Sequence, residues 1–213
     1  MKISFGKYEM EMIHHDPKIY TIEGVISSEE CQHFREISAE YMERSMVSSL
    51  DGEEKKKGAL DKRRTSRNCW VKHNYSATTM SVAKRISELV QMPIANAESF
   101  QVLHYNITQE YQPHMDTFDP ETKLGRSYLG KSGQRILTVL AYLSDVEEGG
   151  ETEFPNIEKK VQPALGKIAV FHDCHEGTDT PHSGSLHGAC PVISGEKWAF
   201  NLWYRKHRVE EEH

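Results

Sequence analysis

Two residues with metal-binding side chains, His114 and Asp116, lie two positions apart in the segment YNITQEYQPHMD, residues 105–116. On a β-strand alternate side chains point to the same face, so this imidazole and this carboxylate would be directed at one point. One more imidazole would complete a 2-His-1-carboxylate facial triad, the donor set that holds Fe(II) and leaves other coordination positions open. In isolation the pair also fits an exposed polar strand, so a metal site requires a further ligand from another segment of the chain.

A third ligand has to come from another strand, and the candidates are the histidines His172, His175, His182 and His187. His187 lies in SLHGACPV, residues 185–192, between an apolar residue and small ones, where a strand could bring it to a metal. His182 lies in a loop, which positions a ligand less rigidly. The cluster HDCHE at 172–176 has none of the usual spacings of a zinc site. Spacing alone leaves the choice of ligand open.

A lysine, Lys197, follows the last of these histidines after a turn through residues 191–195. A hairpin centred near Ile193 would make Lys197 the cross-strand neighbour of His187, on the same face. Burying a lysine is unfavourable unless it is paired. A dicarboxylic cosubstrate bound to the metal at one end would supply that partner at its other end. The alternative is a lysine whose amine reaches solvent from the end of a strand.

The elements that must position these residues follow from the hydrophobic pattern. Before residue 98 it predicts strands at 18–22, 46–49 and 68–72, a helix from a Ser27–Glu30 capping box to about Arg44, and a helix at about 76–90. From Glu98 onward it predicts short strands at 99–106, 111–116, 135–143, 151–154, 167–171, 186–190 and 197–204. The fold class is therefore α+β, with helices against one side of an antiparallel sandwich or barrel. We expect a single domain, residues 1–213.

The composition is that of an ordinary globular protein, with 37% hydrophobic and 27% charged residues among 213. A net charge of -6 argues against a nucleic-acid partner. No apolar run approaches the roughly 18 residues that a membrane span needs, and the N-terminal segment lacks the apolar stretch of a secretory signal. The four cysteines show no CxxC pairing, so we expect a reducing, cytoplasmic location. The oligomeric state stays open.

Five segments carry a family resemblance: Tyr111-x-x-His114-x-Asp116, RILTVLAYL at 135–143, DVEEGGETEFP at 145–155, SLHGACPV at 185–192 and GEKW at 195–198. In this order and spacing they resemble the prolyl 4-hydroxylase-type family of Fe(II)/2-oxoglutarate dioxygenases. The resemblance extends from about Ile22 to Arg205, with the catalytic motifs within residues 98–205. The chain departs from the family at Thr108, where glycine is common, which affects a turn rather than the metal site.

The resemblance implies a double-stranded β-helix, a jelly-roll-like barrel with N-terminal supporting helices. It implies iron bound by His114, Asp116 and His187. It also implies that Lys197, with Tyr105 and Thr152, binds 2-oxoglutarate. The residues implied on the substrate side are Arg135, Tyr111 and Trp203, with Glu98 as a further candidate. Residues 51–64 and 117–132 fall where the family has mobile loops that close over a peptide.

The implied cofactors are Fe(II), 2-oxoglutarate, O2 and ascorbate. The implied reaction is hydroxylation of proline in a peptide or protein, with release of succinate and CO2. Within this chemistry the carboxylate of Asp116 favours hydroxylation, because related halogenases have no carboxylate at this position.

Three alternatives stand beside this interpretation. The first is the same chemistry on a free amino acid, another side chain or a small metabolite. The second is a non-catalytic β-barrel that binds peptides, which succinate release in the presence of Fe(II) would exclude. The third is a cupin-type zinc or manganese isomerase, which would lack the Lys197 pocket.

Overall fold

A computed structural model of the chain describes residues 2–45 and 63–209. The helices are α1 (Ser28–Ala39), α2 (Ala77–Leu89) and α3 (Lys123–Leu129). The strands are β1 (Lys2–Phe5), β2 (Tyr8–His15), β3 (Lys18–Ile22), β4 (Glu43–Arg44), β5 (Arg67–Val71), β6 (Phe100–Tyr105), β7 (Tyr111–His114), β8 (Arg135–Tyr142), β9 (Glu148–Gly149), β10 (Thr152–Phe154), β11 (Lys159–Val161), β12 (Ile168–His172), β13 (His187–Ala189), β14 (Val192–Ser194) and β15 (Lys197–Arg205). The strand expected at 46–49 and most of the loop expected at 51–64 lie outside the described residues.

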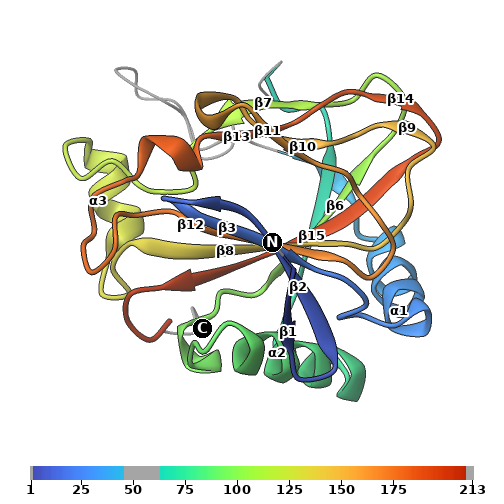
Figure 1. Cartoon of the computed structure of the whole chain (residues 1–213), viewed down its shortest axis with the longest axis horizontal. Coiled ribbons are helices and arrows are strands. Elements are labelled where there is room, and N and C mark those ends of the chain that lie inside the picture. Colours follow the sequence, from blue (N-terminus) through green and yellow to red (C-terminus); the bar gives the residue numbers. More distant parts are fainter. Residues whose placement is uncertain (1, 46–62, 210–213) are drawn as a thin grey trace.

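The strands form two main antiparallel sheets that face each other (Figure 1). The large sheet has nine strands in the order β1-β2-β3-β12-β8-β15-β6-β5-β4, and the small sheet has four in the order β11-β10-β13-β7. The short strands β14 and β9 pair separately. In Figure 1 the small sheet lies above the large one, and α1 and α2 lie below it. The predicted arrangement, helices against one side of an antiparallel barrel, is confirmed.

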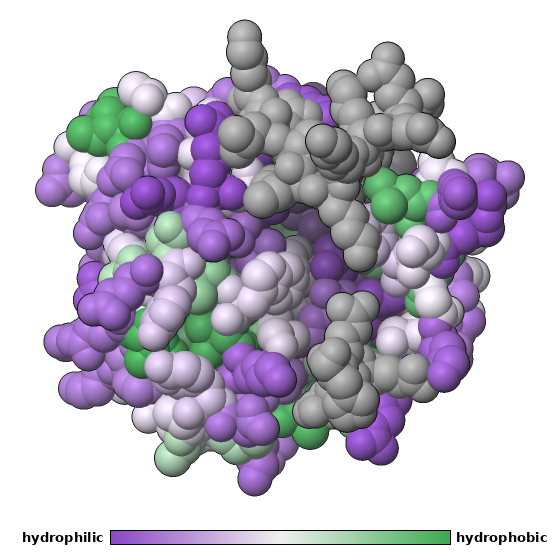
Figure 2. Space-filling view, turned by 180° about the vertical axis from the view of Figure 1, so that it is seen from behind, coloured by the Kyte–Doolittle hydropathy of each residue, from purple (hydrophilic) through white to green (hydrophobic). Residues whose placement is uncertain are grey.

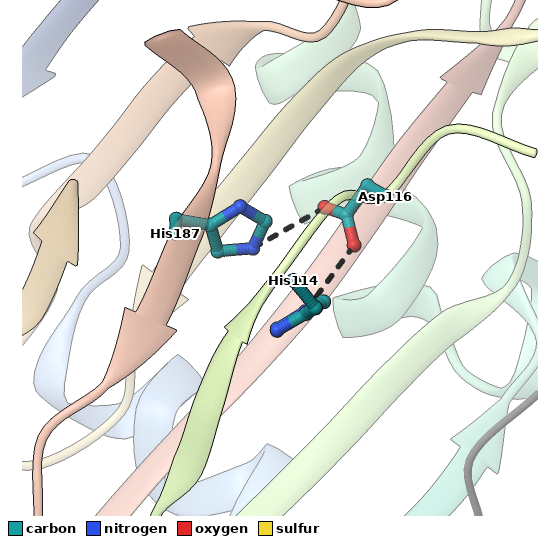
Figure 3. A group of neighbouring side chains, drawn as sticks. All are labelled: His114, Asp116 and His187. Atoms are coloured by element: carbon teal, nitrogen blue, oxygen red, sulfur yellow. Dashed lines mark ion pairs between the residues drawn. The ribbon is translucent and has the colours of Figure 1, made fainter. Parts of the chain in front are cut away.

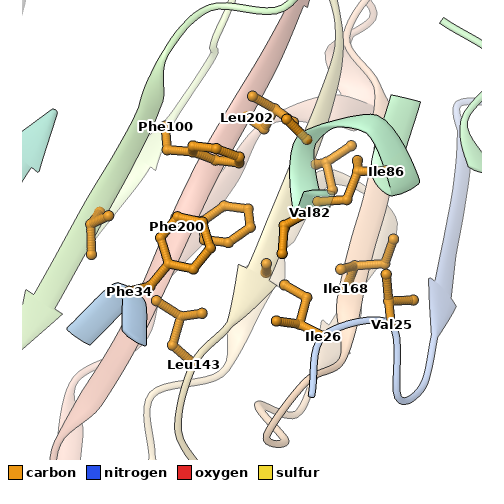
Figure 4. Packing of buried hydrophobic residues seen from close by; sticks show 14 of the residues in the cluster. Val25, Ile26, Phe34, Val82, Ile86, Phe100, Leu143, Ile168, Phe200 and Leu202 are labelled. Carbon is orange, nitrogen blue, oxygen red and sulfur yellow. The ribbon is translucent and has the colours of Figure 1, made fainter. Parts of the chain in front are cut away.

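Strand β15 shows how one sequence builds two different surfaces. Its side chains alternate, so Phe200, Leu202 and Tyr204 belong to the core under the helices, while Ala199 belongs to the core between the sheets. Under the large sheet, Phe200 packs against Phe34 of α1 at a ring-centroid distance of 5.0 Å (Figure 4). Opposite faces of the same strand therefore attach the helices and line the interior of the barrel.

The two predicted helices differ in how well their ends were placed. The capping box of α1 is present, because Ser27 and Glu30 exchange both expected hydrogen bonds. The helix ends at Ala39 rather than near Arg44, because residues 43–44 form the edge strand β4 on β5. No glycine or proline follows Ala39 to mark this end, so pairing with β5 decides it. Helix α2 matches its predicted range closely.

Several elements carry too weak a pattern to be predicted. The N-terminal hairpin of β1 and β2 extends the large sheet at its edge. Helix α3 lies inside the segment 117–132, for which the sequence pattern predicted no helix. This short helix is capped by the Thr122 side chain, which accepts from the backbone N–H of Gly125. The two-residue and three-residue strands β4, β9, β11 and β14 are also additions to the predicted set.

Seen from behind, the surface is largely hydrophilic, with hydrophobic residues gathered in smaller areas (Figure 2). Within the described residues no helix has both the length and the apolar character required to cross a bilayer.

The aromatic cluster of Phe34, Phe100 and Phe200, on the helix side of the large sheet, should contribute strongly to the stability of the fold. Phe200 is fully buried and contacts the rings of Phe34 and Phe100. Phe200→Ala should lower the free energy of unfolding by about 3–5 kcal/mol, because it removes the ring and leaves a cavity. Chemical denaturation measures this change. The exposed Tyr41→Ala, in comparison, should change it by less than about 0.5 kcal/mol; equal losses in the two variants would contradict this assignment of the core.

Candidate active site

Three potential metal ligands meet where the small sheet faces the barrel interior. Strands β7 and β13 are antiparallel neighbours, and His114 and His187 are direct cross-strand partners. Asp116 follows β7, and its carboxylate oxygens lie 3.7 Å from His114 Nε2 and 3.6 Å from His187 Nε2 (Figure 3). The three ligand atoms all lie within 4.8 Å of one another. In the described part of the chain no second group of three such residues occurs.

The orientation of both imidazoles suits metal binding. Nδ1 of His114 lies 3.0 Å from the carbonyl oxygen of Gln112, and Nδ1 of His187 lies 2.9 Å from that of Ser185. A carbonyl oxygen only accepts, so each Nδ1 donates and each Nε2 presents its lone pair to the shared point. Burial, followed by the influence of His187, lowers the pKa of His114 to about 3, so this ring is neutral at pH 7. The donor set fits a divalent iron ion.

The carboxylate of Asp116 is held by a threonine that the sequence pattern did not single out. Thr138 Oγ1 lies 2.8 Å from Asp116 Oδ2 and 2.9 Å from Asp173 Oδ2. A hydroxyl has one proton to donate, so a Thr138 that donates to Asp116 must accept from a protonated Asp173. Burial, and then the negative charge of Asp116, raise the pKa of Asp173 well above its usual value, which agrees with this arrangement.

Asp116 itself stays ionised. Its burial opposes the charge, but the neighbouring His187 and His114 outweigh it and lower the pKa of Asp116 to about 2. Two buried acids, Asp116 and Asp173, thus share one hydroxyl in different protonation states. Only the ionised one faces the imidazoles.

The other candidate histidines lie apart from this group. The ring of His175 packs on that of His182 at a centroid distance of 4.2 Å. His182 Nε2 lies 3.2 Å from a carboxylate oxygen of Asp16 in the turn before β3. Of the four candidates for the third ligand, only His187 joins His114 and Asp116.

Lys197 reaches the site by a route that differs from the predicted one. The hairpin with His187 is wrong, because the chain between them forms β14, which pairs with β9. Lys197 lies in the large sheet, where its cross-strand partner is Tyr105. It nevertheless lines one small cavity together with His114 and His187. The lysine therefore faces the histidines from the opposite sheet.

Lys197 is a buried cation that a bound anion would stabilise. Its side chain is only 2% exposed, and Nζ donates to the carbonyl oxygen of Gly150 at 2.7 Å. Among the residues the structure describes, no carboxylate forms an ion pair with it. Burial lowers the pKa of Lys197 from 10.5 to about 8, so the amine is mostly protonated at neutral pH. A buried cation with unused donors is stabilised by a bound carboxylate.

The residues predicted beside Lys197 line the same cavity. Tyr105 and Thr152 are both buried, and Thr152 exchanges a 2.8 Å hydrogen bond with the hydroxyl of Tyr142. Tyr142, whose ring centroid lies 5.6 Å from Lys197 Nζ, was not predicted. Tyr142 ends the buried apolar strand β8, where the sequence does not distinguish a functional tyrosine from a core residue.

The cavity lies beside a groove of about 2050 Å³ that the four predicted substrate-side residues also line. The ring of Tyr111 stacks on His114 at a centroid distance of 3.6 Å. Arg135 donates to both carboxylate oxygens of Glu98 at 2.8 and 2.7 Å, and its guanidinium carbon lies 3.7 Å from the ring centroid of Trp203. The structure thus brings all four to the same side of the metal-ligating group.

Arg205 also lines this groove, and the sequence analysis did not predict it. It donates to Glu98 at 3.0 Å and to the backbone carbonyl oxygens of Gly133, Tyr128 and Leu129. In the sequence, an arginine at the end of a strand is expected to be exposed to solvent. Arg205 is only 7% exposed, and this burial shows that it helps to hold Glu98 in the side of the groove.

Comparison with known proteins gives a consistent result. Residues 100–205 match the 2OG-Fe(II) oxygenase superfamily. Probable prolyl 4-hydroxylase 7 of Arabidopsis thaliana is 36% identical over 205 residues, covering 88% of this chain and 62% of the relative. Prolyl 4-hydroxylase 5 of the same plant is 35% identical over 227 residues, covering 96% and 74%. The chain thus spans between about three fifths and three quarters of the length of these relatives.

Solved structures agree. The viral collagen prolyl hydroxylase vCPH from Paramecium Bursaria Chlorella virus-1, in its 2OG complex, matches with a TM-score of 0.68 and 25% identity, covering 88% of this chain and 95% of that one. A Pseudomonas putida prolyl-4-hydroxylase, 16% identical with a TM-score of 0.59, shares the fold. The fold is the double-stranded β-helix, as predicted.

The fold and the sequence define a 2OG-Fe(II) oxygenase. Within that superfamily the chain belongs to the prolyl 4-hydroxylases. It is a dioxygenase that uses Fe(II), 2-oxoglutarate and O2, and ascorbate is the usual reductant of the family.

Two substitutions of Thr138 test whether its hydroxyl, rather than the volume of its side chain, positions Asp116 for iron binding. Thr138→Val should weaken iron binding about 10–100-fold, because it removes the hydrogen bond that orients the carboxylate. Thr138→Ser keeps the hydroxyl and should stay within a few-fold of the parent. Titration with Fe(II) under anaerobic conditions measures both. Equal affinity in the valine and serine variants would show that the hydroxyl does not position Asp116.

Proposed function

We propose that this chain hydroxylates proline residues within a peptide or protein, using iron held by His114, Asp116 and His187. In this proposal Lys197 pairs with the far carboxylate of 2-oxoglutarate, and Tyr105 and Thr152 help to hold the same end.

One observation carries the proposal: two histidines of the three-residue metal-ligating group, His114 and His187, line the same small cavity as the buried ammonium of Lys197, from opposite sheets. 2-Oxoglutarate has a keto acid that can chelate a metal at one end and a carboxylate at the other. Such a molecule would satisfy both the open positions of the metal and the unpaired charge of Lys197. An isomerase that handles no diacid has no use for a buried lysine at this place.

When bound, iron with 2-oxoglutarate and O2 supplies the oxidising power for C–H hydroxylation, and succinate and CO2 are released. The chain supplies position and shelter. Lys197 orients the cosubstrate, and the apolar residues Leu103, Leu140 and Ala199 line the cavity around it and limit the access of water. Tyr111 packs on His114, so its ring defines how closely a substrate approaches the metal-ligating group.

The size of the groove favours a peptide over a free amino acid. Pockets for small molecules usually enclose about 300–1000 Å³, and the groove here is about twice the upper value at 2050 Å³. It extends from Lys72, just after β5, and Lys84 of α2 to Lys131, just after α3. An extended chain with a proline over the metal-ligating group fits this shape.

The cysteines bear on where the enzyme works. All four, Cys31, Cys69, Cys174 and Cys190, are free thiols. Free thiols support a reducing compartment, which we propose is the cytoplasm.

Activity on peptides tests the function directly. With Fe(II), ascorbate and 2-oxoglutarate, proline-containing peptides should gain 16 Da by mass spectrometry and release one succinate per hydroxylation. Free proline should give little product, because it is small and can contact only a small part of the groove. Asp116→Ala should abolish both readouts through loss of a metal ligand. Full turnover in that variant would remove Asp116 from the ligand set, and exclusive modification of free proline would reject the peptide substrate.

The buried amine of Lys197 should lower the stability of the fold while it supports binding of 2-oxoglutarate. Lys197→Met should abolish 2-oxoglutarate binding while raising the free energy of unfolding by about 1–3 kcal/mol at pH 7, because it removes a desolvated charge whose pKa is depressed. The cost is fully present below about pH 8, where both the folded and the unfolded chain carry the charge. It disappears toward pH 10.5, where both lose it, so the gain should shrink over that range.

Thermal unfolding from pH 7 to 10.5 and titration with 2-oxoglutarate measure the two effects of Lys197→Met. The exposed Lys159→Met serves as the control and should change neither. Unchanged affinity for 2-oxoglutarate in Lys197→Met would contradict the proposed role of the amine.

A further inference from the structure

The groove carries a charge opposite to that of the whole protein. Nine lysines and arginines but only four aspartates and glutamates line it, whereas the chain as a whole has a net charge of -6. Two of the four acids are already engaged: Asp116 faces the two histidines, and Glu98 binds both Arg135 and Arg205. Outside these pairs, the groove is lined by Arg44, Lys72, Lys84 and Arg208, none of which forms an ion pair with a described residue, against the acids Glu43 and Asp119. A surplus of positive charge therefore faces the interior of the groove.

Part of this surplus lies on a path that leads away from the metal-ligating group. Trp203 lies beside Trp70, with ring centroids 5.9 Å apart, and Trp70 is 52% exposed. Lys72 is the first residue after β5, two positions past Trp70, and it lines the same groove. Lys84 of α2 lines the same end of the groove. Both lysines are exposed, and neither forms an ion pair with the described residues.

Two arginines add to the positive charge of the groove. Arg208 lines it next to Val209, whose backbone N–H donates to the carbonyl oxygen of Ala95, and Arg44 lines it at the edge strand β4. Arg44 is the direct cross-strand partner of Arg67, and like charges in such a pair repel each other. Cations gathered along a groove in an acidic protein are stabilised by an anionic occupant, and their field is effective over roughly 8–10 Å at moderate ionic strength.

We propose that the substrate is an acidic peptide, in which aspartate or glutamate flanks the hydroxylated proline and contacts Lys72 and Lys84. This inference rests on the proposed function and adds the chemistry of the flanking residues. The proline occupies the part of the groove beside Tyr111 and Trp203, and the chain extends past Trp70 toward the two lysines. Carboxylates near exposed lysines contribute modestly one by one, so preference comes from several such contacts together.

Three peptides with the same central proline test this preference, with glutamate, glutamine or lysine at all flanking positions. At low salt kcat/KM for 2-oxoglutarate-dependent hydroxylation should fall in the order glutamate, glutamine, lysine. Each step should be roughly two- to tenfold, mostly in KM, since exposed pairs each contribute only a few-fold. Added salt should compress the differences.

Charge reversal at the end of the groove links the preference to these residues. The double variant Lys72→Glu, Lys84→Glu should lose the advantage of the glutamate peptide and improve the lysine peptide. The matched double variant Lys18→Glu, Lys159→Glu changes the net charge equally at exposed positions outside the groove, and it should keep the parent order.

The outcomes separate this inference from the proposed function. Equal kcat/KM for the three peptides, or a preference that survives reversal of Lys72 and Lys84, would overturn the acidic-substrate inference and leave peptide hydroxylation standing. Modification of free proline with no hydroxylation of any peptide would overturn both.

Discussion

The pairing of β7 with β13 is the constraint on which the site depends. His114 and His187 are more than 70 positions apart in the chain, and only their direct cross-strand register brings the two imidazoles together. Side chains alternate between faces, so a slip of one residue would send His187 to the other side of the small sheet. Asp116, placed just after β7, depends on the same register, since it reaches the shared point only when His114 does.

The large sheet supplies the other residues of the site. It brings Thr138 behind Asp116 and Lys197 opposite the histidines, from strands β8 and β15, which are themselves neighbours. Both of these strands carry an apolar face toward α1 and α2 and a functional face toward the interior. The helices therefore stabilise, from outside, a sheet whose inner face bears a desolvated amine that costs folding energy.

Sequence reasoning succeeded where a local rule applies and failed where a contact crosses the barrel. The two-residue spacing of His114 and Asp116 correctly predicted that both side chains reach one point, although β7 ends at His114 and Asp116 lies just beyond the strand. The capping box of α1 is a local signal as well. His187 was selected by family resemblance, since spacing alone left four histidines. The location of Lys197 was wrong, because nothing local distinguishes a hairpin from a chain that passes through β14. The roles of Thr138 in β8 and of Asp173 just after β12 were missed, since single polar residues in or beside buried strands show no periodic signal.

The most direct test of the account is a crystal structure of the protein grown without O2 in the presence of Mn(II), as an inert substitute for iron, and 2-oxoglutarate. The account predicts one anomalous peak at bonding distance from Nε2 of His114, Nε2 of His187 and a carboxylate oxygen of Asp116. The far carboxylate of 2-oxoglutarate should lie against Nζ of Lys197. A metal bound elsewhere, or a cosubstrate whose far carboxylate points away from that amine, would contradict it.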